Sequence, residues 1–127
     1  MIGILIITHN NVGRALFDAA TSVVGDCPIP VEILSSSQNC DPVERSKKAE
    51  ACLKKLNQQD GTLVITDMYG STPSNIATKL ASDNVTIITG INLPMLVRIM
   101  NYPKLSLKKL ANKAVSAGQT GVIIVKN

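Results

Sequence analysis

The chain has 127 residues, the size of a single domain that can bury its own core. Hydrophobic residues make up 45% of it and charged residues 17%, a composition that excludes disordered and fibrous classes. The formal net charge is +4, but the basic residues lie in helical patterns and no nucleic-acid-binding motif accompanies them. We therefore expect one domain over residues 1–127 and no nucleic-acid partner.

Targeting signals and metal motifs are absent from the sequence. No apolar stretch reaches the roughly 18 residues needed to cross a bilayer, and no basic segment precedes the first apolar run as in a signal peptide. Cys27, Cys40 and Cys52 form no CxxC motif and no pairing with histidine at metal-ligand spacing. These features predict a cytoplasmic protein with reduced thiols and no metal site.

Short β-branched runs alternate with helical patterns along the chain. Strands are predicted at 2–8, 31–34, 62–66, 85–89 and 122–125, and helices at 13–24, 41–57, 73–80, 95–101 and 106–117. The first strand is apolar on both faces, which is typical of a central parallel strand covered by helices on both sides. The alternation predicts a three-layer α/β fold with a mainly parallel open sheet, for which we take the order 2-1-3-4.

Two candidate functional residues follow the first and third predicted strands. They are His9, the only histidine of the chain, and Asp67. In the order 2-1-3-4 these strands are neighbours, and ligands bind beyond the carboxyl ends of such strands where the order reverses. We therefore expect His9 and Asp67 to lie side by side. A carboxylate on one ring nitrogen would set the tautomer and leave the other nitrogen as a nucleophile.

The segment Gly70-Ser71-Thr72-Pro73 is the third component of this candidate site. Its glycine allows close backbone approach, and free N–H groups at the start of the following helix favour an anion. Taken alone, the segment is better explained as an ordinary capped helix. Combined with a nucleophile and a carboxylate, it predicts a phosphohistidine site in which Gly70, Ser71 and Thr72 bind the phosphate.

Other cofactor chemistry has little support. The chain has no Walker-type phosphate-binding loop and no GxGxxG motif, so free nucleotide is not the expected phosphoryl donor. No second carboxylate stands out as a metal partner for Asp67. We therefore expect neither a metal nor any other cofactor.

Three segments carry a resemblance to a known family. Residues 6–9 (IITH), 66–75 (TDMYGSTPSN) and 89–96 (TGINLPML) resemble, in the same order and at similar spacing, the mannose-family IIA domain of the bacterial phosphoenolpyruvate:sugar phosphotransferase system. The resemblance covers essentially the whole chain. It implies a homodimer whose subunits exchange an antiparallel edge strand, and residues 122–125, which follow Gly118 and Gly121, are the candidate for that strand.

The resemblance also implies an activity and partners. His9 would accept a phosphoryl group on Nε2 from the phosphocarrier HPr and pass it to a IIB component. That component phosphorylates sugar during transport through membrane subunits, so this chain would contact the membrane only indirectly. Asp67 corresponds to the family aspartate that hydrogen-bonds the ring, and Ser71 and Thr72 correspond to the loop beside the phosphate.

Two features depart from the family pattern and leave alternatives open. Asn10 stands where many relatives have glycine, and the chain ends at Asn127 without a fused IIB domain, so an acceptor in trans or no acceptor is expected. The same phosphorylation would also suit a regulatory phosphoprotein, because it adds about −1.5 to −2 charges to a surface. A phosphoryl donor for dihydroxyacetone kinase, or a binding module in which His9 has no role, remains open as well. The sugar is not specified by the sequence.

Overall fold

The computed structural model describes residues 1–56 and 59–127. Its middle layer is a four-stranded sheet in the order β2-β1-β3-β4. The strands are β1 (Gly3–His9), β2 (Val31–Ser36), β3 (Thr62–Thr66) and β4 (Val85–Ile88). All neighbouring pairs are parallel, so the predicted order 2-1-3-4 is confirmed.

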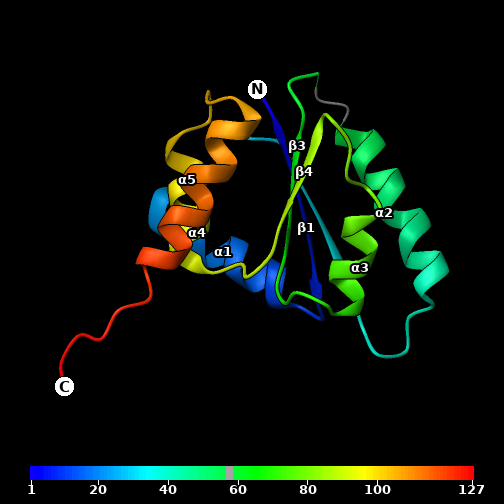
Figure 1. Cartoon of the computed structure of the whole chain (residues 1–127), viewed down its shortest axis with the longest axis horizontal. Coiled ribbons are helices and arrows are strands. Elements are labelled where there is room, and N and C mark those ends of the chain that lie inside the picture. Colours follow the sequence, from blue (N-terminus) through cyan, green and yellow to red (C-terminus); the bar gives the residue numbers. More distant parts are fainter. Residues whose placement is uncertain (57–58) are drawn as a thin grey trace.

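Helices cover both faces of the sheet, as predicted. On one face lie α1 (Val12–Val24), α4 (Leu93–Asn101) and α5 (Leu107–Thr120), and on the other lie α2 (Pro42–Leu56) and α3 (Thr72–Thr78) (Figure 1). None of the described helices is long and apolar enough to cross a membrane.

The alternation of side chains along β1 builds a core on both faces. Ile4 and Ile6 belong to the cluster that packs against α1, α4 and α5, whereas Leu5 and Ile7 belong to the cluster beneath α2 and α3. All four are at most 2% exposed. Because successive residues of a strand point to opposite faces, a strand between two helical layers must be apolar at every position.

Some element boundaries differ from the prediction. Strand β2 extends beyond Leu34, its predicted end, to Ser36. The extension forms because Ser35 and Ser36 pair with Thr8 and His9 of β1. Pairing with a neighbour, not apolarity, extends this strand. Helix α2 is described to Leu56, and Asn57, at which it was expected to end, lies outside the described residues.

The predicted strand at 122–125 does not form within the single chain. Val122, Ile123, Ile124 and Val125 are each at least 71% exposed, and this C-terminal segment extends away from the domain (Figure 1). The reason is its direction, since it leaves the end of α5 away from the sheet and does not run along the free edge of β4. Strand β4 is therefore the last strand of the described sheet, which has no antiparallel strand of its own.

Candidate active site

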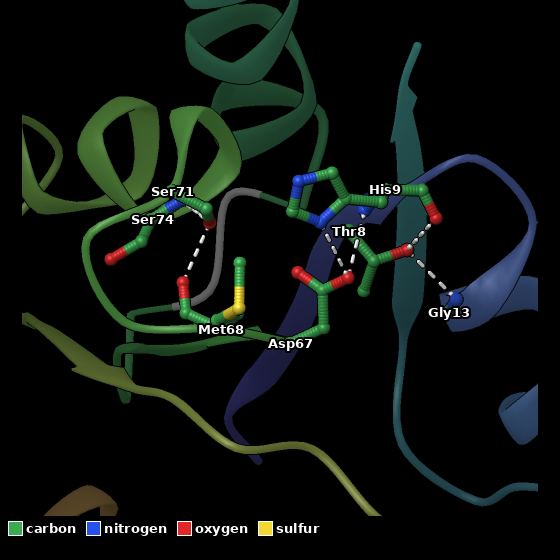
Figure 2. A network of polar contacts seen from close by, with 7 residues as sticks. All are labelled: Thr8, His9, Gly13, Asp67, Met68, Ser71 and Ser74. Atoms are coloured by element: carbon green, nitrogen blue, oxygen red, sulfur yellow. Dashed lines mark hydrogen bonds and ion pairs between the residues drawn. The ribbon is translucent and has the colours of Figure 1, made fainter. Parts of the chain in front are cut away.

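His9 and Asp67 leave neighbouring parallel strands at the same edge of the sheet. Ile7 pairs with Thr66 in the β1–β3 register, so the residues that follow are adjacent. His9 Nδ1 lies 2.9 Å from Asp67 Oδ2, and the backbone N–H of His9 donates to the same oxygen at 3.0 Å (Figure 2). One carboxylate oxygen thus holds both the ring and the backbone of His9.

The two side chains differ in their exposure to solvent. The His9 side chain is 43% exposed, whereas that of Asp67 is 15% exposed. A neutral imidazole that donates from Nδ1 to the carboxylate has its lone pair on Nε2. In Figure 2 this second nitrogen points away from Asp67, on the side where Ser71 and α3 lie. The arrangement leaves the lone pair of Nε2 available as a nucleophile on a partly exposed side chain.

A tight turn follows His9 and depends on Asn10. Asn10 has a φ of 44°, the only positive φ at a non-glycine residue in the described chain. Its N–H donates to the carbonyl of Ser36 at 3.0 Å, which ties the turn to β2. Asparagine is among the few residues that adopt this left-handed conformation readily. Asn10 therefore supports the same backbone that glycine would.

The loop between β3 and α3 is closed by its own hydrogen bonds. Ser71 Oγ donates to the Met68 carbonyl at 2.6 Å and accepts the Ser74 N–H at 3.4 Å, which makes Ser71 the N-cap of α3. The N–H of Gly70, whose φ is 83°, donates to Ser74 Oγ at 3.3 Å. Figure 2 shows Ser71 on the same side as the His9 ring.

Thr72 occupies a different place from Ser71. It is exposed and lines a cleft between α2 and α3, together with Lys47 and Lys79. Of the three predicted phosphate-binding residues, Gly70 and Ser71 thus belong to the hydrogen-bonded loop before α3, whereas Thr72 lines the cleft on the flank of α3.

Sequence reasoning missed Ser74 and Thr8. Ser74 is 2% exposed and accepts the Gly70 N–H, and Thr8 is 1% exposed directly before His9. The only sequence signal for Thr8 is a polar residue at the end of an otherwise apolar strand. Within residues 1–56 and 59–127, no cluster of three or more His, Cys, Asp or Glu side chains is placed to hold a metal ion.

The fold and the site together define a class, an open parallel α/β domain that presents a carboxylate-bound histidine at the carboxyl edge of its sheet. A family model for EIIA-man, described as "PTS system fructose IIA component", matches residues 3–115. The chain belongs to this family of IIA components of the phosphotransferase system.

Individual relatives agree with this assignment. Over 84 residues the chain is 33% identical to the PTS system mannose-specific EIIAB component of Escherichia coli K12, a match that spans 63% of this chain and 26% of that protein. The matched part of this chain therefore spans about a quarter of the length of the curated relatives.

Solved structures show the same fold. The mannose/sorbose-specific IIA subunit from Enterococcus faecalis superposes with a TM-score of 0.88 at 22% identity, covering 99% of this chain and 96% of that one. A PTS IIA protein associated with the fucose utilization operon of Streptococcus pneumoniae gives 0.82 at 27% identity, with coverage of 97% and 92%.

Proposed function

We propose that this chain is a phosphocarrier of a phosphotransferase system. His9 accepts a phosphoryl group from phospho-HPr and passes it to a IIB component for sugar uptake. The observation that carries the proposal is the 2.9 Å contact between His9 Nδ1 and Asp67 Oδ2, which leaves Nε2 free at a half-exposed surface. Membership of the IIA family supports the choice of partners.

The transfer requires one bond to form and one to break. The lone pair on His9 Nε2 attacks phosphorus in line, and the bond between phosphorus and the donor atom breaks with its electron pair leaving on the donor. The ring, which keeps its proton on Nδ1, then carries positive charge. The carboxylate of Asp67 stabilises that charge, and transfer to the acceptor runs through the same steps in reverse.

The loop before α3 binds the phosphoryl oxygens in this proposal. The Ser71 hydroxyl rotates from the Met68 carbonyl towards the phosphoryl group, exchanging one hydrogen bond for a charge-assisted one. The backbone N–H of Thr72 supplies a further donor, and the N–H of Gly70 joins it by giving up its 3.3 Å bond to Ser74 Oγ. In this role Thr72 contributes its backbone, since its side chain lines the cleft beside α3.

We also propose a homodimer in which residues 122–125 add an antiparallel strand to a second copy. Four consecutive β-branched apolar residues, each at least 71% exposed, favour burial against a partner. The outer edge of β4 has no neighbouring strand in the described chain. A cleft lined by Thr86, Leu107 and Ala111 runs along that edge, between β4 and α5, and offers room for the incoming segment.

The test is the intact mass of the protein after incubation with phosphoenolpyruvate, enzyme I and HPr. We expect one acid-labile phosphoryl group on the wild type and none on His9→Ala. An unchanged wild-type mass, with the same partners active on another IIA protein, would refute the proposal. Adding a IIB protein then separates a transport role from a regulatory one, because only the former predicts loss of the phosphoryl group to the acceptor.

A further inference from the structure

Thr8 is a buried polar residue that the proposed chemistry does not yet use. It precedes His9 in β1, is 1% exposed and ranks among the largest fully buried side chains of the chain. Because side chains alternate along a strand, Thr8 continues the row of Ile4 and Ile6, which faces α1 and α4. The His9 side chain continues the opposite row and faces α3. Thr8 therefore touches no reacting atom.

The Thr8 hydroxyl joins the start of α1 to the backbone of His9. Its Oγ1 accepts the N–H of Gly13 at 2.8 Å, and its hydroxyl donates to the His9 carbonyl at 3.2 Å (Figure 2). Helix α1 receives no side-chain cap from Asn11 at its own N-cap position. A buried N–H at a helix start needs a partner, and here the strand provides it.

Gly13 makes this contact possible by its small size. A Cβ at position 13 would lie 2.6 Å from Ile6 Cγ2 and 3.1 Å from Thr8 Oγ1, so a larger residue would push α1 off the strand. Strand and helix thus meet directly on either side of the turn that starts at Asn10. The hydrogen bond between Thr8 and Gly13 sets the distance between the end of β1 and the start of α1.

The backbone of His9 is held from both sides. Asp67 accepts its N–H, and Thr8 donates to its carbonyl. With the peptide groups before and after the residue both bound, the Cα–Cβ direction of His9 is set, and with it the place from which the ring reaches Asp67. The N–H of Asn10, in the same peptide group as the His9 carbonyl, also donates to Ser36, so loss of the Thr8 hydroxyl removes one of two hydrogen bonds to that peptide group.

We propose that Thr8 is a positioning residue for phosphoryl transfer. Its hydroxyl holds the turn after β1 so that the imidazole of His9 stays on Asp67 through Nδ1 and keeps Nε2 available. The kinetic part of this inference rests on the proposed function, whereas the orientation of the ring does not.

The test compares variants of two buried threonines at neighbouring strand ends. Thr8→Val keeps the shape of the side chain but removes the hydroxyl, and Thr8→Ser keeps the hydroxyl. The matched control is Thr66→Val, because Thr66 is 0% exposed and its Oγ1 has no hydrogen-bond partner among the described residues. Each variant is first checked for cooperative thermal unfolding.

The kinetic measurement is the rate of phosphoryl acceptance at saturating phospho-HPr. We expect a loss of about tenfold or more for Thr8→Val, because small misplacements of a reacting group are costly. Thr8→Ser keeps the hydroxyl, and Thr66→Val leaves the hydrogen bonds of Thr8 unchanged. Both variants should therefore retain the wild-type rate to within about twofold. If Thr8→Val does not fold, Thr8→Cys replaces it, because a thiol is only a weak hydrogen-bonding group.

A second measurement on the unphosphorylated protein separates the two proposals. The chain has one histidine, so its ¹⁵N-labelled imidazole gives a single pair of NMR signals that report the tautomer. We expect mainly Nδ1–H in the wild type, Thr8→Ser and Thr66→Val, and a mixture of tautomers in Thr8→Val. Wild-type protein that takes no phosphate would refute the proposed function. The tautomer measurement alone would then decide whether Thr8 positions the ring of His9. A wild-type tautomer in Thr8→Val, or an equal rate loss in Thr66→Val, would overturn the inference.

Discussion

A single oxygen of Asp67, Oδ2, holds His9 at two points, the ring Nδ1 at 2.9 Å and the backbone N–H at 3.0 Å. The other oxygen, Oδ1, is buried and has no hydrogen-bond partner among the described residues. The carboxylate thus directs its hydrogen bonding to one residue. It sets where the imidazole lies and which nitrogen is left for chemistry.

Replacing Asp67 should slow phosphoryl acceptance without unfolding the protein. Asp67→Asn keeps the shape of the side chain but removes the charge that stabilises the phosphorylated ring, so we expect a rate loss of about a hundredfold. Single-turnover phosphorylation by phospho-HPr measures the loss, and circular dichroism checks the fold. Wild-type transfer by Asp67→Ala would show that the carboxylate has no part in the reaction.

Asn10 should tolerate glycine but not a β-branched residue. At a φ of 44°, Asn10→Gly meets no steric penalty, whereas Asn10→Val should lower the free energy of unfolding by about 1–2 kcal/mol. Urea denaturation measures both. Asn11→Val is the control, because Asn11 has a φ of −93° and makes no side-chain cap bond. Equal losses at the two positions would mean that the turn imposes no special strain.

Mutations should separate the two roles of Ser71, which are capping α3 and binding the phosphoryl group. Aspartate also caps helices well, so Ser71→Asp should keep the stability that Ser71→Ala loses, about 1 kcal/mol. Its negative charge should nevertheless repel the phosphoryl group, and both variants should accept phosphate slowly. Thr72→Ala is the comparison, since the Thr72 side chain lines the cleft beside α3. Unimpaired phosphorylation of Ser71→Asp would exclude the hydroxyl as a phosphate ligand.

Removal of residues 122–127 should convert a dimer into a monomer. The exposed apolar residues of this segment have no partner within the described chain, and the proposed exchange gives them one. Light scattering coupled to gel filtration measures the mass in solution. Deleting only Lys126 and Asn127 is the control and should leave the dimer intact. A monomeric wild type at the same concentration would contradict the exchange.

Cys40 should react with alkylating agents at lower pH than the other cysteines. The side-chain and backbone hydrogen bonds from Ser37 lower the pKa of the Cys40 thiol, whereas burial raises the pKa of Cys27 and Cys52. A lowered pKa means that the reactive thiolate is already present at a lower pH. Peptide mass spectrometry after timed iodoacetamide treatment ranks the sites. Ser37→Ala removes the side-chain bond and should slow the alkylation of Cys40, and an unchanged rate would exclude the Ser37 hydroxyl as the cause.

Local sequence pattern was sufficient for the elements that carry the site. The two-sided apolar run of β1 identified a central strand, and turn and capping residues located the helices on either side. With the strand order 2-1-3-4, His9 and Asp67 had to meet, because parallel strands place their carboxyl ends at one edge. Periodicity and capping act over a few residues, so the sequence by itself determined the elements, whereas the strand order that brings His9 and Asp67 together was an assumption that the structure confirmed.

The remaining features depended on contacts between distant parts of the chain. Ser35 and Ser36 belong to β2 through pairing with β1, and Thr8 acquires its partners only when α1 folds back onto the strand. Residues 122–125 have the composition of a strand but no edge within reach in the single chain. A segment forms a strand only where a neighbouring strand pairs with it, and a buried hydroxyl forms hydrogen bonds only where a partner lies close to it. Only the tertiary structure decides both, because each depends on atoms that the local sequence does not contain.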